Sequence, residues 1–190
     1  MKSISEVKFM SNLRKYFPRI LLLDTVILVI AATLAAMILN AFGMKFRKWV
    51  IILVLLLTAI GFVSGAIQLL LKIRRPAVRI GFVSLFAVIT IAVGIAAAPL
   101  ALFAFAGEEH VVERDGAKYV AHVNGWLDTY VYYLEYKSFL TEGSVKRIEE
   151  YYGDGGFDPI GSEHEYTVVR TIYYDEAGNI LSVVEDADEN

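Results

Sequence analysis

The chain has 190 residues, of which 56% are hydrophobic and 21% charged, with no cysteine and a formal net charge of −3. An ordinary soluble domain is about 45–50% apolar, so this composition favours a membrane protein over a soluble enzyme. It also excludes a disordered chain, a nucleic-acid binder that relies on bulk positive charge, and a secreted domain held together by disulfides.

The small net charge conceals two regions of opposite charge. Residues 1–106 carry 12 Lys and Arg against 2 Asp and Glu, a net charge of +10. Residues 107–190 carry 6 Lys and Arg against 19 Asp and Glu, a net charge of −13, together with 10 of the 11 tyrosines. A change of composition this sharp predicts a domain boundary between residues 106 and 107.

Residues 1–19 have the pattern of a basic amphipathic helix, with apolar residues at steps of three and four and basic residues between them. Ser3 and Glu6 fit a capping box that would start this helix, and Pro18 is expected to end it. Such a helix would lie on an anionic cytoplasmic leaflet. The alternative is a frayed positive tail that only sets the topology.

Residues 20–106 are predicted to form a three-helix transmembrane region, with spans at about 20–42, 49–71 and 80–105. A span needs about 20 apolar residues to cross roughly 30 Å of hydrocarbon. Asp24 is the only charged residue of the first span, and the other two contain none. The first span is longer than the apolar stretch of a signal peptide, about 7–15 residues, so we expect an uncleaved helix.

The Lys and Arg residues predict the orientation of these helices, because cytoplasmic segments are enriched in them. The tail and the second loop lie on one side and hold nine, whereas the first loop holds three. We therefore expect a cytoplasmic N-terminus and an extracytoplasmic C-terminal domain. The residues expected at the cytoplasmic surface include Lys8, Arg14, Lys15, Arg74 and Arg75, and those of the first loop are Lys45, Arg47 and Lys48. The first-loop cations would be attracted to the acidic domain or would meet lipid phosphates.

Small residues recur within the predicted spans and indicate close helix packing. Gly61 and Gly65 form a GxxxG motif, Ala31 and Ala35 have the same spacing, and so do Gly94 and Ala98. The sequence leaves open whether these faces pack within the chain, against another protein or against a second copy.

Three polar residues lie at similar predicted depth near the cytoplasmic ends of the spans: Asp24, Gln68 and Ser84. They would form one cluster that holds the helices together or marks a small polar site, because ionisable groups inside membranes are costly. In the simpler interpretation, Asp24 reaches water or pairs with Arg19.

Residues 107–190 predict a small antiparallel sheet of five or six strands, so that the whole chain is α+β. The strand-like segments are 110–113, 118–124, 129–139, 166–174 and 180–185, and Asp115-Gly116 is a hairpin turn. Residues 144–152 fit either a strand or a short helix.

An exterior binding face is predicted from Tyr130, Tyr132 and Tyr136, which alternate along one segment, and from Trp126 just before it. Tyrosine offers apolar area with a polar tip, which suits the binding of a protein or a glycan. The alternative is an aromatic ladder within the sheet, with Trp126 at the membrane interface.

No catalytic, cofactor or metal-binding motif is recognisable, so we expect no enzyme, no cofactor and no metal. Asp154, Asp158 and the run Glu163-His164-Glu165 carry ligand-type side chains but lack a recognised spacing.

The sequence therefore predicts a non-enzymatic protein of a bacterial cytoplasmic membrane, since the exterior region lacks both cysteine and an Asn-x-Ser/Thr acceptor. We expect an accessory or regulatory subunit whose exterior domain binds a protein or an envelope component. Its partners would be lipids and another membrane or envelope protein or a second copy, and no nucleic acid. One alternative is an immunity or envelope-stress protein against a toxin or antimicrobial peptide. The other is a small transporter or channel component that uses Asp24.

Overall fold

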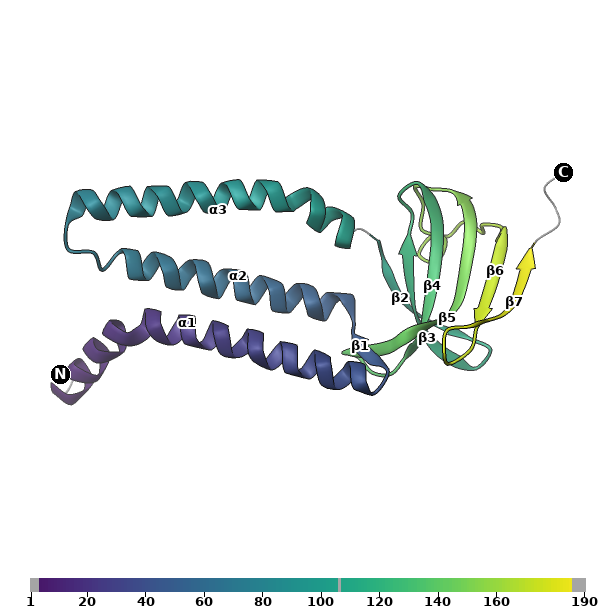
Figure 1. Ribbon diagram of the computed structural model, residues 1–190, viewed down its shortest axis with the longest axis horizontal. Coiled ribbons are helices and arrows are strands. Elements are labelled where there is room, and N and C mark those ends of the chain that lie inside the picture. The colour runs from purple at the N-terminus through teal and green to yellow at the C-terminus, as the bar shows by residue number, and fades with distance from the viewer. Residues whose placement is uncertain (1–3, 106, 186–190) are drawn as a thin grey trace. The chain divides into compact units, whose positions relative to one another are not determined.

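The computed structural model describes residues 4–105 and 107–185, which form three long helices and one antiparallel sheet (Figure 1). These residues fall into two compact units, a helical unit within Met1–Ala35 and Ile51–Ala101 and a sheet unit within Ala36–Val50 and Leu102–Asn190. The helices are α1 (Ile4–Ala41), α2 (Lys48–Leu70) and α3 (Pro76–Phe105). The prediction of three long apolar helices with an antiparallel sheet is confirmed.

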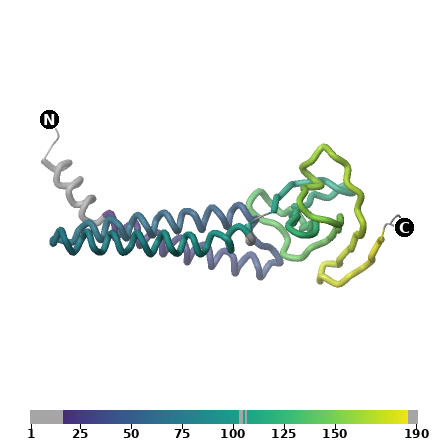
Figure 2. Tube along the Cα trace, turned by 90° about the horizontal axis from the view of Figure 1, so that it is seen from above, coloured from purple at the N-terminus to yellow at the C-terminus, as the bar shows by residue number. Residues whose placement is uncertain are grey.

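Each helix contains a stretch long and apolar enough to cross a membrane, namely Phe17–Ala41, Lys48–Leu70 and Pro76–Leu102. Figure 2 shows that these three stretches lie along one common axis. Most of their apolar side chains are exposed when the chain stands alone. Such a surface is stable in hydrocarbon and costly in water, so these helices indicate a membrane protein.

Helices α1 and α2 pack closely at the GxxxG motif. Gly61 and Gly65 are buried, and Thr25 of α1 lies directly over Gly61. A Cβ atom on Gly65 would lie 2.7 Å from Cδ2 of Leu22, so only glycine permits this approach. The motif therefore packs within the chain, which the sequence left open.

The prediction that Pro18 ends the tail helix is wrong, because α1 continues through Pro18 without a break. Proline removes one backbone hydrogen bond from a helix, but a long helix can continue on both sides of it. Ser3 of the predicted capping box lies outside the described residues, as do the side chains of Lys8, Arg14 and Lys15.

The sheet has the strand order β2-β3-β4-β5-β6-β7, with β1 paired to the start of β5, and all pairs are antiparallel. Residues 144–152 lie within a strand, and residues 166–169 precede β6 rather than belonging to it. The strands are β1 (Met44–Phe46), β2 (Glu109–Arg114), β3 (Ala117–Asn124), β4 (Asp128–Tyr136), β5 (Thr141–Asp154), β6 (Arg170–Tyr174) and β7 (Ile180–Glu185).

Strand β1 comes from the loop between α1 and α2 and was not predicted. Gly43, at φ 66°, ends α1 in the left-handed conformation that favours glycine. The next three residues then pair with Thr141–Gly143 of β5. The first loop is thus part of the same sheet as the C-terminal region.

Strand β5 pairs irregularly with β4, with register shifts after Asp128, Tyr133 and Leu134. Such bulges bend a strand and interrupt the alternation of its side chains. On β4, the consecutive residues Tyr133 and Leu134 are both buried, and so are their β3 partners Ala121 and Val120. Because successive side chains of a strand point to opposite faces, side chains are buried on both faces of the sheet here. The main core lies on one face of the sheet, where Ile160 of the β5–β6 loop packs against it. Its buried members are Ala121, Val123, Val131, Tyr133 and Ile148.

Candidate functional site

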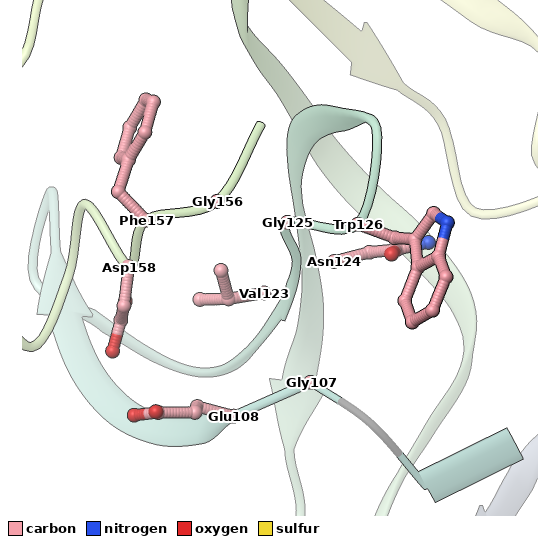
Figure 3. A pocket seen from close by; sticks show the side chains of 9 residues that line it. All are labelled: Gly107, Glu108, Val123, Asn124, Gly125, Trp126, Gly156, Phe157 and Asp158. Atoms are coloured by element: carbon pink, nitrogen blue, oxygen red, sulfur yellow. The ribbon is translucent and has the colours of Figure 1, made fainter. Parts of the chain in front are cut away.

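A pocket of about 300 Å³ lies in the sheet unit where three segments meet. They are the residues before β2, the β3–β4 turn and the loop after β5 (Figure 3). Its lining consists of Gly107, Glu108, Val123, Asn124, Gly125, Trp126, Gly156, Phe157 and Asp158.

Glycines allow these segments to approach one another. The Gly156 amide donates to the Gly125 carbonyl at 2.6 Å, and the Gly155 amide donates to the Leu127 carbonyl at 2.7 Å. A Cβ atom on Gly125 would lie 2.8 Å from the Phe157 carbonyl oxygen. Gly156 also has a φ of 98°, which L-residues rarely adopt. The loop after β5 is therefore held against the β3–β4 turn by its backbone.

The pocket has an aromatic side and an acidic side. Figure 3 shows Trp126 on one side and the carboxylates of Glu108 and Asp158 on the other. Trp126 is 60% exposed, whereas Phe157 stacks on Tyr166 with ring centroids 4.1 Å apart. Phe157 is thus a packed part of the pocket wall, whereas Trp126 offers an accessible surface to a ligand.

The acidic side is a cluster of three ligand-type side chains, Glu108, His110 and Asp158. His110 Nε2 lies 2.7 Å from Asp158 Oδ2 and 3.6 Å from Glu108 Oε2. Burial disfavours the charged form of Asp158, but the Gly161 and Ile160 amides, Glu108 and His110 together outweigh burial and lower the pKa of this carboxyl. Asp158 is therefore a stable negative charge beside the pocket.

This arrangement suits an amphipathic cation. The carboxylates of Glu108 and Asp158 would pair with an amine or a guanidinium group, and the exposed indole of Trp126 would cover an adjoining apolar or cationic part. No nucleophile with an adjacent general base is recognisable among the lining residues.

The predicted exterior face is divided between separate places in the sheet unit. Tyr130 and Tyr132 stack with centroids 6.1 Å apart, and Tyr130 also contacts Tyr151 at 4.9 Å. These half-buried rings form an aromatic ladder. Tyr136 instead lies under the Arg47 guanidinium, 5.8 Å from its ring, while Trp126 belongs to the pocket.

The predicted intramembrane cluster is not joined by any hydrogen bond in the described part of the chain. Asp24 and Ser84 are exposed and Gln68 is half-buried. Thr25 rather than Asp24 faces α2, and its hydroxyl donates to the Leu21 carbonyl at 2.8 Å.

The remaining small residues of the spans show no comparable contact. Ala35 is half-buried and Ala31 is exposed. On α3, Gly94 and Ala98 are exposed, and a Cβ atom on Gly94 would meet no described atom within 4 Å. Arg74 and Arg75 are exposed in the turn before α3.

Sequence reasoning missed the groups that come together from distant segments. Of the ligand-type residues it singled out, only Asp158 belongs to a cluster, and its partners are Glu108 and His110 rather than Glu163–Glu165 or Asp154. The pair Gly155-Gly156 just before Asp158 was the available signal, because paired glycines mark a close backbone approach.

Comparison with known proteins found no match, whether with a family model, a curated sequence or a solved structure.

Proposed function

We propose that this chain is a non-enzymatic accessory or regulatory subunit of a bacterial cytoplasmic membrane. Its N-terminus would be cytoplasmic, and its extracytoplasmic β domain would bind a basic segment of a protein or another envelope component. The observation that carries the proposal is the pocket that sets exposed Trp126 opposite Glu108 and Asp158.

Strand β1 supports the proposed topology. It lies between α1 and α2 yet pairs with β5 of the C-terminal region. Strands of one sheet lie on the same side of a membrane, so the chain between them must cross it an even number of times. The two candidate spans in that interval are α2 and α3.

The cations of the first loop fit an extracytoplasmic position once their partners are considered. Lys45 pairs with Glu142 at 3.4 Å, Arg47 pairs with Glu109, and Lys48 Nζ donates to the Gly107 carbonyl at 2.9 Å. All three first-loop cations bind residues of the sheet unit. Their position outside the cytoplasm is therefore a weaker objection to the orientation that the other Lys and Arg residues favour.

A regulatory role is supported by the way the helices enter the sheet unit. The end of α1, the start of α2 and the end of α3 all belong to it. A partner that shifts the sheet would therefore act on the ends of all three helices.

The test is photo-cross-linking of the full-length protein in native membranes, with a photoreactive amino acid at Trp126. We expect a specific adduct that Glu108→Gln and Asp158→Asn together reduce at least about five-fold, because a paired charge is lost. Substitution of the exposed Leu181 of β7 is the matched control position. Equal labelling of the same species from both positions would contradict the proposal.

A role in immunity against a cationic toxin or antimicrobial peptide is a second candidate, because the acidic side of the pocket would suit such an attacker. In that case the cross-linked species would be the peptide itself. Cells that carry the chain would survive it, and Glu108→Gln with Asp158→Asn would remove the protection.

A further inference from the structure

A second cluster of ligand-type side chains lies in the sheet unit, built from three strands. Glu109 of β2 and His122 of β3 are directly paired across the sheet, and Glu142 of β5 joins them. One ligand atom from each side chain lies within 4.8 Å of the others. His122 Nε2 is 2.8 Å from Glu142 Oε2.

The cluster contains a buried carboxylate oxygen whose bonding capacity is unused. Oε2 of Glu109 is buried and accepts no hydrogen bond from any residue that the structure describes. A buried acceptor without a partner destabilises the fold, and more so where the group is charged. Glu142, only 1% exposed, brings a second carboxylate to the same place. A ligand that accepts electron pairs from both would remove this destabilisation.

We propose that Glu109, His122 and Glu142 form a binding site for a divalent transition-metal ion, with Zn²⁺ as the best fit. One imidazole nitrogen and two carboxylate oxygens are a ligand set that Zn²⁺ accepts, with water in the fourth position. The ion would lie between Oε2 of Glu109, Oε2 of Glu142 and Nε2 of His122.

The neighbouring cations are compatible with this site. Arg47 pairs with Oε1 of Glu109 and Lys45 with Oε1 of Glu142, so both hold the oxygen that the ion would not use. Groups of this kind orient metal ligands from the outer shell. The side chain of Lys45 is 48% exposed, so its ammonium group can move into water when the ion adds positive charge.

The cluster beside the pocket provides an internal comparison. His110 follows Glu109 in β2, and adjacent residues in a strand point to opposite faces. Both oxygens of Asp158 already have partners there, Oδ1 with the Ile160 amide and Oδ2 with His110. Glu108 is exposed. This second trio also offers one imidazole and two carboxylates, but none of its side chains has an unsatisfied buried atom.

The test uses the full-length protein in detergent, stripped with a chelator and titrated with Zn²⁺ against a chromophoric competitor. We expect one Zn²⁺ per chain, and we expect His122→Gln to weaken binding by at least about ten-fold. The matched control is His110→Gln, which is expected to stay within about two-fold of wild type.

A second measurement separates lost binding from lost folding. Zn²⁺ should raise the thermal midpoint of the wild type and of His110→Gln but not that of His122→Gln, with all three giving the same far-UV circular dichroism before Zn²⁺ is added. Bound Co²⁺ should give the visible absorption bands of a four-coordinate site. Absence of saturable binding, or equal loss in the two histidine variants, would overturn the proposal.

Discussion

The helical and sheet units follow opposite rules of burial. In the helical unit, the described residues that are buried are Pro18, Thr25, Gly61 and Gly65, and the apolar side chains face outward. In the sheet unit, apolar side chains of β3, β4 and β5 form a buried core, although those of β7 are exposed. Arg47, Glu142 and Glu150 are buried there with partners. The first pattern suits lipid, where close contact needs small residues. The second suits water, where buried charges must be paired.

Removal of the glycine contact between α1 and α2 should have the largest effect on stability. Gly61→Leu should destabilise the helical unit by about 3 kcal/mol, because the new side chain meets Thr25. The measurement is resistance to unfolding in sodium dodecyl sulfate, followed by circular dichroism. Gly94→Leu is the matched control and should have no effect, because a Cβ atom there meets no described atom. Equal loss in both variants would mean that this contact is not the main one.

In the sheet unit, the burial of a charged side chain should decide how much its ion pair contributes to stability. Arg47→Ala should cost about 2 kcal/mol, since it strands the buried carboxylate of Glu109. Lys45→Ala should cost less than about 1 kcal/mol, because its ion pair is partly exposed. The side chains of Arg47 and Lys45 are 9% and 48% exposed. Hydrogen exchange of the β1 amides measures both effects, and the opposite ranking would refute this account.

A polar network inside the core should contribute less to stability than the Arg47 ion pair. The Tyr133 hydroxyl donates to Glu150 Oε2 at 2.6 Å, Tyr152 donates to the same atom at 2.9 Å, and Arg114 pairs with the other oxygen. Tyr133→Phe should cost about 1.5 kcal/mol, because two partners of Glu150 remain. Urea unfolding followed by near-UV circular dichroism measures it.

The matched control for Tyr133→Phe is Tyr130→Phe, in the half-buried aromatic ladder. Tyr130→Phe should leave the stability nearly unchanged, because the ring of Tyr130 makes the contacts with Tyr132 and Tyr151 and is kept in phenylalanine. A larger cost for Tyr130→Phe than for Tyr133→Phe would argue against the network.

The smallest expected effect is the pH-dependent contribution of Asp158 to stability. Burial raises the pKa of this carboxyl, but the Gly161 and Ile160 amides, Glu108 and His110 together outweigh burial, so the folded-state pKa lies below the ordinary value. The stability that Asp158 contributes is therefore present above the unfolded pKa of about 3.9 and is lost as pH falls through the lower folded pKa. Asp158→Asn should be less stable than wild type by about 1 kcal/mol at pH 7, with the gap closing towards pH 2. A gap that does not depend on pH would exclude an ionic cause.

Local patterns were sufficient for most elements but not for their connections. The apolar runs predicted three helices, and alternation with turn residues predicted strands close to β2, β3, β4 and β7. The prediction that Pro18 ends the first helix was wrong, because a long helix can continue on both sides of one missing hydrogen bond. The tyrosines of β4 were expected either to form a binding face or to form an aromatic ladder. Tyr130 and Tyr132 stack on each other, whereas Tyr136 contacts Arg47.

The sequence by itself determined the two opposite compositions, the three apolar stretches long enough to span a membrane and the presence of an acidic sheet, because these depend on neighbouring residues. Only the tertiary structure decided that the first loop becomes β1, that Gly61 faces Thr25, and that the run Glu108-Glu109-His110 serves two clusters. These outcomes depend on segments far apart along the chain. A three-residue strand has no pattern of its own, and its partner in β5 lies about a hundred positions away. The small total charge of −3 thus reflects two units of opposite charge, and the cations of the first loop form ion pairs within the acidic unit.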